Sequence, residues 1–379
     1  AINSISIIGL IVIAFTLLGV ASDKAPAADV YLIGNWPAPF GIVLVLDRLA
    51  ALMLVLTSVL AMAALSFALA HWHKASPNFH TIFQLLLMGL NGAFLTGDLF
   101  NLFVFFEVML AASYGLALHG SGPARVKAGM HYIAVNLVAS SLFLIGVSLI
   151  YGVTGTLNMA DLAQKIAQVT PEDRMLLEAG AAILAVAFLV KAGMWPLNFW
   201  LVPAYTAAAA PIAAIFAIMS KVGIYVLLRL SPLMFGIGAG DSYGFGSDWL
   251  YYGGMITLAF GLIGVVASQA MGRLASYSIL VSSGTLLAAI GSGNTAMTGA
   301  ALFYMVSSTL TIAAFFLLIE LVERGQDAAA NVLAVTMEAY GDDEEEDDEE
   351  EVGVVLPATL AILGTCFAIV AILLIGLPP

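Results

Sequence analysis

Three ionisable side chains lie deep inside apolar runs of this chain and are the first candidates for chemistry. Glu107, in the stretch FFEVML, falls about eight residues into the apolar segment 99–118, which is about 12 Å of helix. Lys191 lies in LVKAGMWPLNFW and Lys221 in IFAIMSKVGIYVLL. An ionised group at the centre of a membrane helix costs about 2.5–3.5 kcal/mol, so such residues are rare and usually functional. An acid and two lysines on three helices therefore predict a proton relay, in which a proton at one site changes the energy of the next.

Less specific interpretations stay open for each of these charges. Glu107 could be a structural partner in an ion pair that never moves a proton, and the two lysines could snorkel toward an interface. Asp47 and Arg48 stand together near the start of an apolar segment and are interpreted as an interfacial pair. Glu320 and Glu323 close another apolar segment and are also interpreted as interfacial.

A helix break is predicted directly after Lys191, where Gly193 and Pro196 follow. Proline removes a backbone donor and clashes with the preceding turn. Breaks at membrane depth occur where they face protein or a wet cavity. The sequence therefore places a lysine beside an irregular, internally facing piece of backbone.

Two hydroxyl-rich patches could hydrate a proton path through the helices. They are VSSGT, with Ser282 and Ser283, and VSSTLT, with Ser307 and Thr311. The alternative is ordinary packing between membrane helices, which also favours small residues.

The composition predicts an all-α integral membrane protein built as a polytopic helix bundle. Of its 379 residues, 61% are hydrophobic and only 10% are charged, whereas soluble domains carry about 25% charged residues. Apolar runs of roughly 20 residues recur along the chain. Their short connections favour antiparallel neighbours. The eleven predicted segments are 2–21, 41–69, 81–97, 99–118, 130–151, 176–201, 211–230, 251–271, 275–291, 300–322 and 354–377.

We interpret residues 1–379 as a single membrane domain and as a fragment truncated at both ends. The chain enters an apolar run at once after Ala1 and stops at GLPP, where an apolar helix would continue. Ten acids form the run DDEEEDDEEE, and a block of like charge cannot collapse. Residues 325–352 are therefore predicted to be an acidic, disordered extramembrane loop. The stretch 156–168 is predicted to lie along the interface as a short amphipathic element.

Several classes of function are excluded. The net charge is −13, and the ten-acid run accounts for ten of these negative charges, so the rest of the chain carries only −3. This leaves no basic surface for nucleic acid. A single cysteine, Cys366, provides no disulfide framework and no thiolate metal site. No GxxxxGK[ST] loop is present, which argues against an ATP-driven pump of that class. No metal, redox centre or other cofactor is predicted, so the energy must come from an ion gradient or a partner.

Four stretches resemble a known transporter family: 34–58 (GNWPAPFGIVLVLDRLAALMLVLTS), 96–116 (TGDLFNLFVFFEVMLAASYGL), 151–162 (YGVTGTLNMADL) and 189–225. They closely resemble the D-type subunits of multisubunit cation/proton antiporters of the Mrp, Mnh or Pha type. That family is similar to the antiporter-like proton-pumping subunits of respiratory complex I. The similarity runs along nearly the whole chain.

The resemblance implies a 14-helix fold with two inverted five-helix repeats, each with a broken helix. The eleven segments would be helices two to twelve of that fold, and Pro378 would mark the second break. Glu107 matches the family's essential glutamate on helix five, Lys191 the lysine of broken helix seven, and Lys221 the lysine of helix eight. This chain departs from its relatives on helix eleven. Many relatives have a histidine near Ser307, and complex I subunits have a lysine near Thr311.

The function implied is a proton-translocating subunit of a complex that exchanges Na⁺ or K⁺ for H⁺ in pH and salt homeostasis. Its partners would be the other antiporter subunits, and its location the bacterial cytoplasmic (inner) membrane. It would be an ion transporter subunit and not an enzyme. Two alternatives remain: a proton-pumping subunit of NADH:quinone oxidoreductase or a related membrane hydrogenase, and a non-conducting structural subunit.

Overall fold

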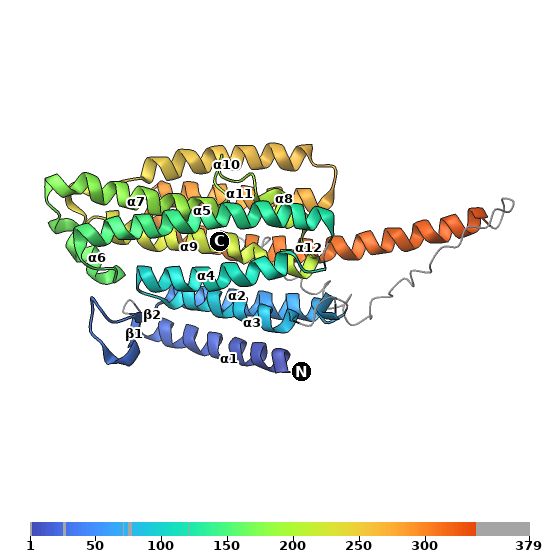
Figure 1. Ribbon diagram of the computed structural model, residues 1–379, viewed down its shortest axis with the longest axis horizontal. Helices are drawn as coiled ribbons and strands as arrows, with labels where there is room; N and C mark the ends of the chain where they lie inside the picture. Colours follow the sequence, from blue (N-terminus) through green and yellow to red (C-terminus); the bar gives the residue numbers. More distant parts are fainter. Residues whose placement is uncertain (1, 26–27, 71, 75–77, 121, 339–379) are drawn as a thin grey trace.

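A computed structural model describes residues 2–25, 28–70, 72–74, 78–120 and 122–338. The predicted segment 354–377, the acidic run 342–351 and Pro378 lie outside the described residues. Over the described residues the chain is a bundle of long helices with one small hairpin of strands at one end (Figure 1).

The helices alternate with short connections. The long ones are α1 (Ile2–Asp23), α2 (Arg48–Ala68), α3 (Phe79–Leu95), α4 (Leu99–Ala117), α5 (Pro123–Thr154), α7 (Pro171–Ala192), α9 (Ala210–Phe235), α10 (Ser247–Ala267), α11 (Met271–Gly291) and α12 (Thr295–Glu338). The short ones are α6 (Met159–Lys165) and α8 (Leu201–Ala207). Within the described ranges, nine helices are long and apolar enough to cross a membrane, and α3 is a shorter apolar helix.

The predicted membrane bundle is confirmed, with differences at the segment ends that have local causes. Segment 41–69 is shorter as a helix because Asp47 accepts a hydrogen bond from the Ala50 backbone N–H and caps α2. Residues before it form β2 (Val43–Leu46), which pairs antiparallel with β1 (Asp29–Leu32). Segment 176–201 is not one helix, since α7 ends at Ala192.

The loop predicted for residues 325–352 is wrong over its first part. Helix α12 continues to Glu338, and its red end extends past the other helices in Figure 1. Ala, Leu, Met and Glu dominate the stretch AAANVLAVTME, and these are strong helix formers. The like-charge block that motivated the prediction begins only at residue 342.

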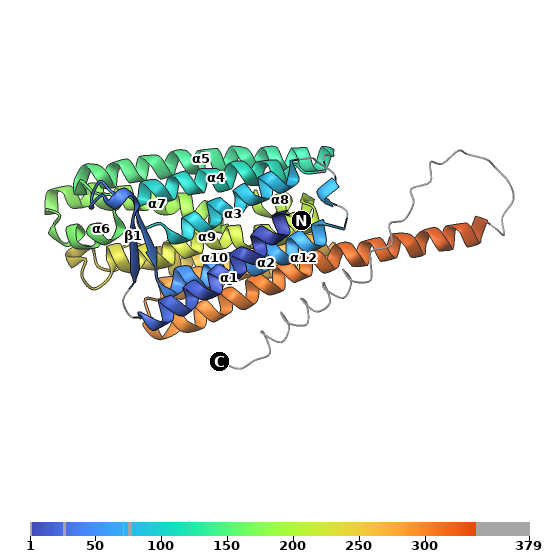
Figure 2. The same ribbon diagram turned by 90° about the horizontal axis from the view of Figure 1, so that it is seen from below.

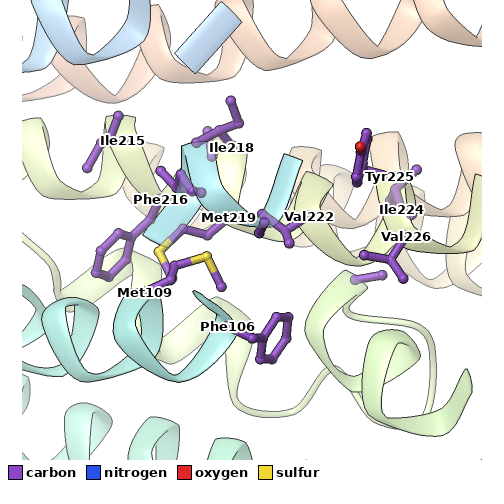
Figure 3. Packing of buried hydrophobic residues seen from close by; sticks show 14 of the residues in the cluster. Phe106, Met109, Ile215, Phe216, Ile218, Met219, Val222, Ile224, Tyr225 and Val226 are labelled. Carbon is purple, nitrogen blue, oxygen red and sulfur yellow. The ribbon is translucent and has the colours of Figure 1, made fainter. Parts of the chain in front are cut away.

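Helix α9 forms the centre of the bundle. Every residue from Ala210 to Leu227 is buried, and α9 contacts α2, α3, α7, α11 and α12. Figure 3 shows Met109 of α4 pointing to the side of α9 that carries Phe216 and Met219, while Tyr225 points elsewhere. A helix that is apolar on all sides belongs inside a bundle, and this one carries Lys221 there.

Glycines allow some of these helices to approach closely. A Cβ atom on Gly284 of α11 would lie 2.7 Å from the Gly254 carbonyl oxygen of α10, and one on Gly254 would lie 2.8 Å from the Gly284 oxygen. Similarly, a Cβ atom on Gly223 of α9 would lie 2.6 Å from the Phe188 oxygen of α7. Small residues at such crossings are a common feature of membrane bundles.

Replacing Gly284 by leucine should therefore force α10 and α11 apart. We expect a loss of about 1–3 kcal/mol in stability, the usual cost of overpacking, measured as a lower melting temperature of the purified complex. Gly152→Leu in α5 is the matched control, because no atom lies within 4 Å of the Cβ position there. Equal melting temperatures for the two variants would contradict the close-packing argument.

Candidate functional site

Lys191 lies in the last turn of α7, where the helix stops. Gly193 caps α7 with a left-handed conformation (φ 75°), and its N–H donates back to the carbonyls of Leu189 and Val190. The chain then turns through Pro196 to reach α8. The ammonium is thus held near the negative end of the α7 dipole, which favours a cation.

Neutral groups surround the Lys191 side chain, which is only 1% exposed. Its Nζ lies 3.4 Å from the Tyr132 hydroxyl and 3.4 Å from Asn136 Oδ1. The rings of Phe106, Tyr132 and Trp200 lie 5.8, 5.3 and 5.9 Å away, measured to their centroids. Aromatic faces attract cations at such distances, so the lysine occupies an aromatic cage with two oxygen acceptors.

Glu107 lies on α4, half-buried and close to this cage. Its Oε1 accepts a hydrogen bond from Ser140 of α5. None of the ion pairs among the described residues joins Glu107 to Lys191. The acid and the lysine are therefore neighbours without a direct contact in this structure.

One face of α5 supplies the partners of both charges. Tyr132, Asn136 and Ser140 are spaced by four residues, which places them in a row on a helix. Helix α5 packs against α4 and α7 (Figure 2). The sequence did not reveal the row, because each residue alone is unremarkable within 130–151. The four-residue spacing of polar residues was the signal that could have found it.

Lys221 of α9 is fully buried and has a different partner. Its Nζ donates to Ser282 Oγ of α11 at 2.7 Å, and Ser282 lies 2.9 Å from Ser308 Oγ of α12. A short row of hydroxyls thus leads from the central lysine toward α12. A neutral oxygen accepts a hydrogen bond from the ammonium here, so the site can hold a charged lysine without a counter-ion in contact.

Among the predicted hydroxyls, only Ser282 contacts a lysine. Ser283 is buried, and its hydroxyl has no hydrogen-bond partner among the described residues. Ser307 donates to the Tyr304 carbonyl, and Thr311 donates to the Ser307 carbonyl, both within α12. Ser308, adjacent to Ser307, was not singled out in the sequence. Successive helix positions are rotated by about 100°, so a patch of hydroxyls does not say which of them faces the neighbouring helix.

A second polar row joins α9 to the N-terminal part of the chain. Arg229 donates to Asp47 Oδ1 at 2.8 Å and to the Tyr225 hydroxyl at 2.9 Å, and Tyr225 donates to the Phe94 carbonyl at 2.5 Å. The predicted Asp47–Arg48 pair is wrong, because Asp47 faces Arg229 instead. A cavity of about 590 Å³ opens beside this pair, lined also by Gly97 and Asn158.

Outside the spans, Asp98 caps the start of α4 by accepting from the Asn101 N–H at 2.8 Å. Burial raises the pKa of the Asp98 carboxyl, and hydrogen bonds from the Asn101 and Phe100 backbone oppose this.

At the other end of the bundle, Trp72 Nε1 donates to Glu320 at 2.8 Å. In the described part of the chain, no group of three His, Cys, Asp or Glu side chains could hold a metal.

Known protein families with the same membrane architecture match this chain. The family described as "NADH:quinone oxidoreductase/Mrp antiporter, TM" matches residues 96–379. The chain belongs to this family. The resemblance to the D-type antiporter subunits is also confirmed, because the D subunit of a probable K⁺/H⁺ antiporter of Rhizobium meliloti is 68% identical over 370 residues. That alignment covers 98% of this chain and 69% of the relative.

Two further members of the family support the assignment. The D subunit of the Na⁺/H⁺ antiporter of Alkalihalophilus pseudofirmus is 37% identical over 326 residues, covering 83% of this chain and 63% of the relative. A chain of the solved Mrp complex from Dietzia sp. DQ12-45-1b is 32% identical with a TM-score of 0.71, covering 83% of this chain and 59% of that one. The present chain thus spans roughly two thirds of the length of such relatives.

Replacing Ser282 by alanine should impair any process that needs a charge on Lys221. A hydrogen bond to a charged group contributes about 1.5–3 kcal/mol, so we expect at least a tenfold lower cation-dependent proton flux in membrane vesicles. Ser283→Ala is the matched control, since the adjacent hydroxyl has no partner among the described residues. The assignment is wrong if both variants behave alike.

Proposed function

We propose that this chain is the D-type, proton-translocating subunit of a multisubunit antiporter that exchanges Na⁺ or K⁺ for H⁺. Support comes from relatives named as antiporter subunits, one for K⁺ and one for Na⁺. The other antiporter subunits would be its partners, and the bacterial cytoplasmic (inner) membrane its location. The chain would act as an ion transporter and not as an enzyme.

The observation that carries this proposal is the burial of two lysines among neutral oxygens, one beside a half-buried acid. Lys191 and Lys221 contact hydroxyl and amide groups, and Glu107 contacts Ser140. A purely structural ion pair would be expected to place the carboxylate on the ammonium. The separated arrangement suits groups whose charge changes during a working cycle.

We assign three roles on this basis. Lys221 carries the proton at the centre, and Ser282 and Ser308 extend its path toward α12. Glu107 and Lys191 modulate it by forming and breaking an ion pair. At a separation of about 4 Å and an effective dielectric of about 20, such a pair would gain about 4 kcal/mol. Forming or breaking it is therefore large enough to shift a proton on a nearby site.

Removal of the acid is the direct test. In Glu107→Ala, expressed with all antiporter subunits, we expect the complex to assemble and cation-driven proton movement in everted vesicles to vanish. The reason is that Lys191 then loses the carboxylate that changes its energy. Asp241→Asn is a control, because this exposed acid pairs with Arg174 at the surface. Full antiport in an assembled Glu107→Ala complex would end the proposal.

The second candidate is a proton-pumping subunit of a respiratory complex. It is favoured by the family description, which joins quinone oxidoreductases to antiporters. The neighbouring genes separate the two: genes for small antiporter subunits support the first function, and genes for quinone-reductase subunits support the second.

A non-conducting structural subunit is the third candidate. It would be preferred if Lys221→Ala and Glu107→Gln both left transport and its pH profile unchanged.

A further inference from the structure

The polar row on α5 sets the partners of both Glu107 and Lys191. Tyr132, Asn136 and Ser140 are all buried, and each contacts a neighbouring helix. Two other polar side chains of α5 behave differently, since Ser141 and Ser148 donate to the carbonyls four residues earlier in α5 itself. The row is thus the part of α5 that is directed at Glu107 and Lys191.

The orientation of the Asn136 amide is fixed by its own helix. Its Nδ2 donates to the Tyr132 carbonyl at 2.7 Å, which leaves Oδ1 facing the Lys191 ammonium at 3.4 Å. Tyr132 is held by Ser113 of α4, whose Oγ lies 2.6 Å from the phenol oxygen. Both oxygen acceptors are therefore placed in advance, and they do not depend on the lysine for their position.

The acid and the cage are one helical turn apart on this face. Ser140 holds Glu107, and Asn136 holds Lys191, four residues or about 6 Å along α5. A lysine has a flexible four-carbon stem and can span such a distance. The structure shows the ammonium in the neutral cage, and a position against Glu107 lies within reach of this stem.

We propose that Asn136 and Tyr132 are positioning residues that hold the Lys191 ammonium in this neutral cage, away from Glu107. The cage competes with the carboxylate for the same cation. Without that competition the ion pair persists, and Lys191 no longer alternates between the two positions. This inference rests on the proposed function, since it assigns a cause to the breaking of the Glu107–Lys191 pair.

The charged and titratable groups near the cage can be named. They are Glu107 and Tyr114 of α4, Tyr132 of α5, Tyr205 of α8 and, on the neighbouring helix α9, Lys221. Of these groups, Glu107, Lys191 and Lys221 are the ones to which the proposed function assigns a change of charge. A change in the cage should therefore alter the pH profile of transport, and not only the amount of assembled complex.

The test uses the whole complex in everted vesicles, with cation-dependent proton movement measured across pH. Asn136→Leu removes the amide and should lower the maximal rate about tenfold, the equivalent of one hydrogen bond to a charged group, with a changed pH profile. Tyr132→Phe keeps the ring and removes the hydroxyl, so a smaller loss of about threefold is expected. Ser141→Ala, on the same helix but bonded to its own backbone, should leave both unchanged.

Asn136→Asp keeps the shape of the side chain and guards against misfolding of the leucine variant. Its carboxylate would trap the ammonium in the cage, so an assembled complex with at least tenfold lower antiport is expected. Wild-type rate and pH profile in an assembled Asn136→Leu or Asn136→Asp complex would overturn the inference. So would a loss of assembled complex with an unchanged pH profile, which indicates structure alone. Glu107→Gln is measured in parallel: if it too transports normally, the proposed function fails, and not just this inference.

Discussion

The burial of two ammonium groups inside a helical membrane bundle is the constraint on which the rest of this structure depends. A desolvated charge is costly unless hydrogen bonds and favourable dipoles replace water. Here Lys191 has aromatic faces, two neutral oxygens and the end of a helix, and Lys221 has a serine that continues to a second serine. Neither lysine has a carboxylate in contact among the described ion pairs.

The fold meets this constraint with local irregularities. Helix α7 stops one residue after Lys191, because Gly193 adopts the left-handed conformation that ends a helix. The Trp200 indole, from the turn that follows, donates to the Val190 carbonyl at 3.2 Å and also forms one wall of the cage. One break thus exposes helix-end carbonyls beside the lysine, supplies an aromatic ring and satisfies one of those carbonyls.

The sequence predicted the features that single residues reveal, and missed those that depend on how the helices are rotated relative to one another. Charges in apolar runs are rare, so Glu107, Lys191 and Lys221 could be selected from their sequence positions alone, and their roles stay predictions. The family resemblance also predicted the bundle. Ser308 and the α5 row were missed because polar residues in helices are common. The neighbouring helix that each one faces is known only once the helices are packed. Asp47 was paired with Arg48 by proximity, but its partner Arg229 lies 182 positions away.

The row formed by Asp47, Arg229, Tyr225 and the Phe94 carbonyl has a consequence for how the chain is made. Synthesis runs from the N-terminus, so α2 and α3 are complete before α9 emerges. Asp47 and the Phe94 carbonyl are therefore already synthesised when Arg229 and Tyr225 enter the bilayer with α9. Lys221 must wait for α11 to supply Ser282, 61 residues later. The arginine end can thus anchor α9 against helices already in place, while the central lysine receives its partner only when the later helices close around it.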